Sequence, residues 1–101
     1  MVNSIKIAGY VTIEPTSYNS KGNMCSFSIC NKQNDFSHFF KVISFNQLSE
    51  TTKLLKKGDL VYVEGTLRSR KWENRTLIEI CASSIEKQIR TPRTEPVNRP
   101  F

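Results

Sequence analysis

The sequence predicts an all-β domain, a five-stranded Greek-key barrel with one short helix between the third and fourth strands. Five segments alternate apolar and polar residues with a period of two, which is typical of half-buried strands. A single segment carries helix start and stop signals. One helix cannot supply the crossovers that a parallel sheet of five strands needs, so a closed or partly open barrel is the natural arrangement.

The first two predicted strands cover residues 4–13 and 24–31. In the first strand we expect a bend at Gly9, where a side chain would obstruct a curved sheet, and an inward face made of Ile5, Ile7, Gly9, Val11 and Ile13. Pro15 should end this strand, and the turn-forming residues 18–23 should lead into the second. The expected inward face of the second strand is Cys25, Phe27 and Ile29.

A polar connection at residues 32–35 precedes a third strand at 37–45, and the predicted helix follows at 46–57. Asn46 or Ser49 is the candidate N-cap. An acid, Glu50, lies early, lysines lie late, and Gly58 follows, which are the usual signals of a short helix.

The last two strands are predicted as a hairpin at residues 60–69 and 76–86. The expected inward residues of the fourth strand are Val61, Val63, Gly65 and Leu67; in the fifth, Ile78, Ile80 and Ala82 lie opposite Leu77, Glu79 and Cys81. This element order is that of the oligonucleotide-binding (OB) fold. SH3-like barrels are the nearest alternative, but they usually lack a helix of this length at that position.

We expect one domain at residues 1–88, followed by a disordered, basic, proline-containing tail at 89–101. A chain of 101 residues is too short for a two-domain enzyme with an interdomain cleft. The longest apolar run, residues 60–63, is far too short to cross a bilayer, and the N-terminus carries no recognisable secretory signal.

The three cysteines favour an intracellular location. Cys25, Cys30 and Cys81 are odd in number, and their spacing fits neither a secreted disulfide framework nor paired zinc knuckles. Together with His38 they could form a zinc site, but packing in or near the sheets is the simpler interpretation. We therefore expect no metal and no cofactor.

The net charge of +6 is unevenly distributed. Residues 51–101 hold eleven of the fifteen basic side chains and six of the nine acidic ones. Within that half, Arg68, Arg70, Lys71 and Arg75 surround a single acid, Glu73. A second basic excess lies in the tail. This distribution indicates an anionic partner for the hairpin.

Aromatic rings and basic side chains share the outward faces of the third and fourth strands. Phe39, Lys41 and Phe45 fall on one face of the third; if Val61 and Val63 face the core, the even residues from Tyr62 to Trp72 face outward. Rings stack on unpaired bases and cations contact phosphates, so this surface favours single-stranded nucleic acid. The candidate binding residues are Phe39, Lys41, Phe45, Tyr62, Arg68, Arg70, Lys71, Trp72 and Arg75.

Structural alternatives exist for these residues. Phe39 and Phe45 could belong to the core or to a subunit interface, and the basic cluster could be a solvated hairpin. Trp72, beside Arg70 and Lys71 in a polar hairpin tip, is harder to explain by packing.

Three segments resemble the bacterial-type single-stranded DNA-binding protein (SSB) family. They are residues 9–15, 39–45 and above all 55–72, with the ordered series Leu-x-Lys-Gly…Val-x-Val-x-Gly-x-Leu-x-x-Arg-x-Trp. The resemblance covers residues 2–86 and implies an OB fold that binds single-stranded DNA in replication, recombination and repair. It also implies stacking by Phe39, Phe45 and Trp72, and phosphate contacts by Lys41, Arg68, Arg70 and Lys71.

The resemblance further implies a homo-oligomer, a tetramer rather than a dimer, in which the edge strand at residues 2–7 pairs subunits. Family members usually carry a long tail with an acidic tip ending in Pro-Phe that recruits repair enzymes. This chain ends in Pro100 and Phe101, but the preceding residues are basic, which puts recruitment of replication or repair proteins in doubt. The connection at residues 31–37 also lacks the tryptophan that many members use for stacking.

The expected location is therefore the cytoplasm, with the nucleoid, and an organellar, phage or plasmid origin is left open. The alternative function is a primosome-type OB adaptor that acts mainly through protein contacts. An enzyme is not expected, because the chain has one histidine, no glycine-rich phosphate loop and no credibly spaced carboxylate pair. RNA binding remains open, since stacking surfaces accept both nucleic acids.

Overall fold

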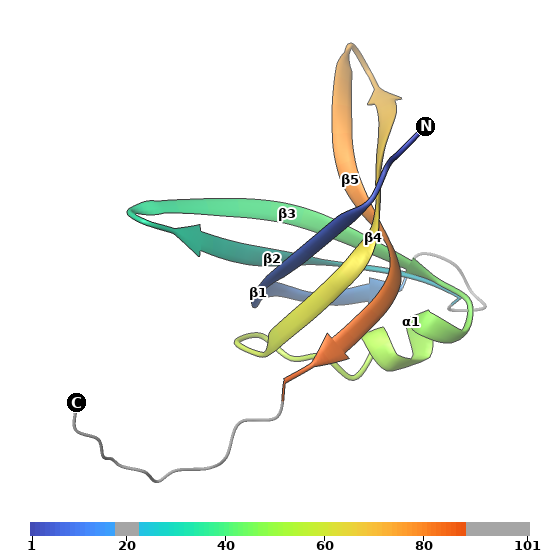
Figure 1. Ribbon diagram of the computed structural model, residues 1–101. Coiled ribbons are helices and arrows are strands. Elements are labelled where there is room, and N and C mark those ends of the chain that lie inside the picture. Colours follow the sequence, from blue (N-terminus) through green and yellow to red (C-terminus); the bar gives the residue numbers. More distant parts are fainter. Residues whose placement is uncertain (18–22, 89–101) are drawn as a thin grey trace, which may run out of the picture.

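The computed structural model describes residues 1–17 and 23–88. The strands are β1 (Ile5–Ser17), β2 (Met24–Gln33), β3 (Phe36–Phe45), β4 (Leu60–Trp72) and β5 (Arg75–Lys87), and helix α1 (Gln47–Thr52) lies between β3 and β4. They form a closed barrel in the order β1-β2-β3-β5-β4 (Figure 1). The predicted OB-type barrel with its short helix is therefore confirmed. The predicted tail at residues 89–101 and most of the predicted loop at 18–23 lie outside the described residues.

Pairing of β3 with β5 closes the barrel. These two strands run parallel, with Val42 opposite Ile80 and Ile43 opposite Cys81, whereas all the other neighbouring strands run antiparallel. The parallel contact brings the middle of β3 next to the β4–β5 hairpin. This topology decides which outward side chains can meet.

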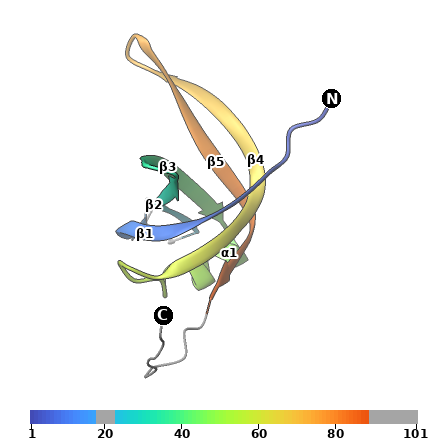
Figure 2. The same ribbon diagram turned by 60° about the vertical axis from the view of Figure 1, so that its left-hand side comes forward.

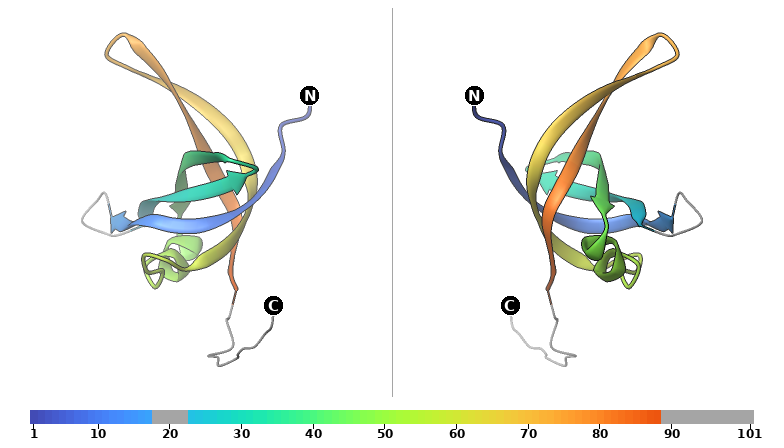
Figure 3. Two further views of the ribbon diagram at one scale, coloured as in Figure 1. Left: turned by 90° about the vertical axis from the view of Figure 1, so that its left-hand side faces the viewer. Right: turned by 90° about the vertical axis from the view of Figure 1, so that its right-hand side faces the viewer.

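Two hairpins extend beyond the barrel and leave it in different directions (Figures 1 and 2). The β2–β3 arm comprises residues 30–39 with a turn at Asn34 and Asp35, and the β4–β5 arm comprises residues 67–80 with its tip at Glu73 and Asn74. Helix α1 lies at the end of the barrel opposite the β4–β5 tip (Figure 3).

The core fills the barrel with side chains from every strand and from the segment after the helix. Its buried members are Val11, Phe27, Ile29, Val42, Leu55, Val61, Val63, Ile80 and Ile85. The predicted inward faces of β2 and of the first half of β4 are thus confirmed. Cys25 and Cys30 are also buried, and all three cysteines are free.

The structure corrects the prediction for β1, which continues to Ser17 rather than ending before Pro15. The register against β2 shifts between Val11 and Ile13 and again between Ile13 and Thr16. Irregular pairing of this kind tolerates a proline, which cannot donate to a regular ladder. The first shift also turns Ile13 out of the barrel, so its predicted inward position is wrong.

Steric crowding explains why position 9 is a glycine. A Cβ atom there would lie 2.6 Å from the carbonyl oxygen of Cys30 on the neighbouring strand. β1 and β2 approach closely at this point, as the predicted bend requires.

Helix α1 is also shorter than predicted and ends at Thr52 instead of residue 57. After Thr52, the N–H groups of Leu54 and Leu55 donate to carbonyl oxygens only three residues earlier, which tightens the turn. This turn places Leu55 in the core, and the late lysines fall outside the helix. Neither N-cap candidate caps by its side chain: Asn46 makes no cap hydrogen bond, and Ser49 lies inside the helix.

The hairpin strands β4 and β5 are longer than predicted, and their outer halves leave the barrel. Leu67 and Ile78 have the parity of core residues but are exposed, because the β4–β5 arm extends past the barrel's other strands. Over the described ranges, no helix has the length and apolar character needed to cross a bilayer.

Candidate nucleic-acid interface

The outer face of the barrel gathers basic side chains where β3, β5 and β4 lie side by side. Lys41 comes from β3, while Arg68 and Arg70 come from β4. Strand β5 lies between them, since it pairs with β3 on one side and with β4 on the other. Residues separated by about thirty positions in the sequence therefore share one small surface.

A single buried carboxylate, Glu79 of β5, stands at the centre of this surface. Its side chain is 2% exposed, and its oxygens lie 3.0 Å from Arg70 Nε, 3.4 Å from Arg68 Nε and 3.5 Å from Lys41 Nζ. We call these four residues the Glu79 cluster. Three cations around one anion leave a net charge of +2 at this position.

The pKa of Glu79 reflects these neighbours. Burial by itself raises the pKa of a carboxyl group, because it disfavours the charged form. The hydrogen bond and charge of Arg70, the charge of Lys41 and the hydrogen bond from Arg68 outweigh that effect and hold the pKa of Glu79 below its usual value. Glu79 is therefore ionised at neutral pH, and the ion pairs are intact.

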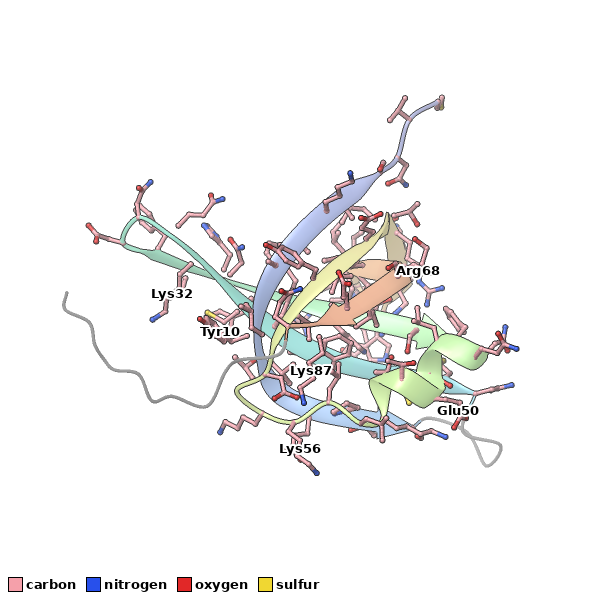
Figure 4. The ribbon with its side chains drawn as sticks, turned by 60° about the horizontal axis from the view of Figure 1, so that its bottom comes forward. Tyr10, Lys32, Glu50, Lys56, Arg68 and Lys87 are labelled. Carbon is pink, nitrogen blue, oxygen red and sulfur yellow. The ribbon has the colours of Figure 1, made fainter. Side chains whose placement is uncertain are left out.

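Phe45 is joined to the cluster through Arg68. The Arg68 guanidinium carbon lies 5.6 Å from the centre of the Phe45 ring, which is cation–π geometry. Figure 4 shows the Arg68 side chain reaching from β4 toward the end of β3. Phe45 is half-buried rather than fully exposed. One face of its ring already has a partner.

Two other predicted stacking residues are open to solvent on the two arms that lead away from this cluster. Phe39, on the same face of β3 as Lys41, is 66% exposed. Trp72 is exposed at the end of the β4–β5 arm and pairs across the tip with Arg75. Phe39 and Trp72 share the outward parity of the cluster and lie beyond it, one on each arm. Neither is a core residue.

Two predicted site residues do not join this surface. Lys71 has the opposite parity to Arg70 and Trp72, so its side chain leaves the other face of the β4–β5 arm. Tyr62 is exposed on the outer face, but at the far end of β4. There it lines a hollow with Lys6, Glu64 and Glu86, in surroundings where acids outnumber bases.

Sequence reasoning missed Glu79 as a member of the site. The sequence did contain a signal for it. If the hairpin tip is the pair Glu73 and Asn74, counting residue pairs back along both strands places Glu79 opposite Arg68. It also missed exposed Phe36 and the stacked rings of His38 and Phe40, whose centres lie 6.5 Å apart, on the opposite face of β3. Within the described ranges, no three histidine, cysteine or acidic side chains gather closely enough to hold a metal ion.

The sequence matches the Single-strand binding protein family over residues 2–88. It is 35% identical over 103 aligned positions to Single-stranded DNA-binding protein 2 of Chlorobaculum tepidum, covering 84% of this chain and 70% of that relative. A closed OB barrel with rings and cations on its outer face is the architecture expected of such a family. The chain belongs to the single-strand binding protein family.

Two solved structures share the fold. One is the small single-stranded DNA-binding protein from Streptomyces coelicolor, with a TM-score of 0.75 and 24% identity, covering 88% of this chain and 95% of that one. The other is the Plasmodium falciparum SSB in complex with single-stranded DNA, with the same TM-score and identity, covering 88% and 96%. At this level of identity the likeness shows the fold, and the site rests on this chain's own geometry.

Proposed function

We propose that this protein binds single-stranded DNA without sequence preference. The observation that carries the proposal is the net-positive Glu79 cluster on the outer face of the barrel, with the exposed rings of Phe39 and Trp72 on the same outward parity of the two arms that lead away from it. Base–aromatic stacking contributes about 1–3 kcal/mol per base and tolerates every base. Phosphate contacts by Lys41, Arg68, Arg70 and Arg75 would add affinity that depends on salt but not on sequence.

The remaining predicted residues have secondary places in this proposal. Lys71 would contact a strand that passes around the edge of the β4–β5 arm, and Phe45 would stack only on the ring face that Arg68 leaves open. Tyr62 would take part only if the strand continues across the far end of β4. A duplex hides its base faces, so single strands are preferred.

Trp72 provides the direct test, because it is the only tryptophan in the chain. We expect its fluorescence to be quenched when oligo(dT) is added at low salt, and an equimolar duplex to quench it much less. A titration with oligo(U) shows whether RNA is accepted as well. Unchanged affinity for oligo(dT) in a Phe39→Ala/Trp72→Ala double variant, followed by anisotropy of a labelled oligonucleotide, would contradict the proposed site.

The proposal includes a homo-oligomer, with a tetramer favoured over a dimer. Residues Ile5–Tyr10 of β1 pair with β4 on one side, whereas the register with β2 begins only at Tyr10. The Asn31 side chain donates to the carbonyl oxygen of Ala8, so it is the other edge of β1 before Ala8 that can accept a strand of a second copy. Light scattering of the free protein and of its oligo(dT) complex gives the number of subunits; a strictly monomeric protein would contradict this part.

We further propose that binding serves replication, recombination and repair wherever DNA strands are exposed, in a bacterial cytoplasm or an organelle, and that the protein catalyses no reaction of its own. The comparisons do not favour the adaptor alternative. An adaptor would be distinguished from a DNA-binding protein by two results together: no binding to DNA, and specific capture of a replication protein.

A further inference from the structure

Glu79 places a negative charge in the middle of a surface proposed to bind phosphates. A purely repulsive role is hard to reconcile with its position, since the side chain is 2% exposed and lies beneath cations that are 35–40% exposed. Burying a carboxylate costs free energy that paired hydrogen bonds must offset. The question is what this buried charge does for the cations above it.

We propose that Glu79 is a positioning residue of the nucleic-acid interface: it holds the guanidinium groups of Arg68 and Arg70 by their Nε atoms so that their terminal nitrogens face an incoming phosphate. This inference rests on the proposed single-strand binding and adds a role for a group that does not itself contact the strand.

Each arginine bonds to a different oxygen of the Glu79 carboxylate. Arg68 Nε donates to Oε1 at 3.4 Å, and Arg70 Nε donates to Oε2 at 3.0 Å. A guanidinium carries five N–H donors in a rigid fork, so a bond at Nε engages one donor and leaves the terminal donors for another partner. Each arginine side chain is 40% exposed although its Nε atom is bonded to a buried carboxylate.

Phe45 restrains Arg68 from a second direction. The ring lies 5.6 Å from the guanidinium carbon and so limits rotation of the group about its hydrogen bond to Glu79. Arg68 is therefore held by an ion pair and by an aromatic face that come from different strands. Cations ordered in advance lose less conformational entropy when a phosphate binds, which favours affinity.

Positioning and simple electrostatics predict opposite results when the charge is removed. Glu79→Gln raises the net charge of the cluster, so charge alone predicts tighter binding to DNA. Under the positioning role, Glu79→Gln replaces one of the two oxygens that the arginines use with an NH2 donor and removes the charge that pairs with them, so we expect oligo(dT) affinity to fall on the order of tenfold.

Glu64→Gln is the matched control. Glu64 is exposed on the same outer face of β4, nearer the start of the strand than Arg68, and its neutralisation changes the net charge by the same amount. We measure oligo(dT) affinity of both variants by anisotropy at low salt, with thermal unfolding followed to confirm that both are folded. Glu79→Gln that binds as tightly as Glu64→Gln, or more tightly, overturns the inference.

A second variant tests the positioning role without removing the buried carboxylate, so it gives a result even if Glu79→Gln fails to fold. Arg68→Lys/Arg70→Lys preserves every charge and leaves Glu79 paired, but an ammonium group has no fork to orient. We expect a loss on the order of tenfold in affinity, and no further loss when Glu79→Gln is added to it. Wild-type affinity in the lysine variant, or an additive loss in the combination, also overturns the inference.

Failure of the proposed function itself gives a different result. In that case the wild-type protein shows neither quenching of Trp72 nor a rise in anisotropy with oligo(dT). An active wild-type protein with an unaffected Glu79→Gln variant removes only the positioning role.

Discussion

The two arms of the molecule arrange their side chains by different physical means. At the base of the β4–β5 arm, Arg68 and Arg70 are held by ion pairs to buried Glu79. In the β2–β3 arm the ordered contact is between rings, with His38 and Phe40 stacked at 28° to each other and Phe39 exposed on the other face. One arm is organised by charge and the other by aromatic packing.

Under the proposed function, the β4–β5 arm would supply most of the cation–phosphate contacts together with stacking by Trp72, whereas the β2–β3 arm would contribute mainly stacking by Phe39. Contacts between cations and phosphates weaken steeply with salt, whereas stacking responds weakly to it. Substitutions in the two arms should therefore differ in salt dependence as well as in size.

The largest effect is expected in the β4–β5 arm. Arg68→Ala/Arg70→Ala removes two of the proposed phosphate contacts and should weaken oligo(dT) binding about a hundredfold at low salt. The slope of log affinity against log salt should become shallower by about 1.4, at about 0.7 for each phosphate on a single strand. Anisotropy titrations at several KCl concentrations measure both quantities.

Lys56→Ala/Lys57→Ala is the control for this pair, since it removes the same charge from the exposed turn after α1, away from the β4–β5 arm. An equal loss in that variant would mean that net charge, rather than the position of the arginines, determines affinity.

A smaller effect with a different salt signature is expected in the β2–β3 arm. Phe39→Ala should weaken binding about tenfold through the loss of one stacked base, with little change in salt slope. Phe36→Ala is a close match, because Phe36 is 68% exposed against 66% for Phe39 but has the opposite parity on β3. A greater loss for Phe36→Ala would place the strand on the opposite face of the arm.

The smallest effect is expected for Glu79→Gln, on the pH dependence of the free energy of unfolding. In the folded protein Arg70, Lys41 and Arg68 lower the pKa of Glu79. The stability that ionised Glu79 contributes is therefore complete above its unfolded-state pKa and is lost as the pH falls through its folded-state pKa. Wild-type protein should be more stable than Glu79→Gln at pH 7, and the gap should narrow on acidification. Urea unfolding at a series of pH values measures it; a gap that widens in acid contradicts the assigned ionisation.

Much of the fold could be predicted from periodicity. The alternation of Cys25, Phe27 and Ile29, and of Val61 and Val63, identified buried faces that the structure confirms, because a strand with one face in a core must alternate. Where prediction failed, irregular geometry intervened: the register shifts expose Ile13, and the tight turn after Thr52 shortens the helix.

The candidate site was predictable in part, for a related reason. Parity placed Lys41, Arg68, Arg70 and Trp72 on outward faces, but parity describes one strand at a time. Parity already separates Lys71 from Arg70, and only the basic cluster and the resemblance placed Lys71 in the site. What parity could not show is that Tyr62 lies beside Glu64 and Glu86, or that Arg68 covers a face of the Phe45 ring.

The sequence by itself determined the element order, the inward faces of the central strands and the concentration of positive charge in the β4–β5 hairpin, because these depend on local spacing and composition. Only the tertiary structure decided that Lys41 and the two arginines converge on Glu79. That convergence depends on the parallel pairing of β3 with β5, a contact between segments about forty residues apart that leaves no mark on the periodicity of either strand.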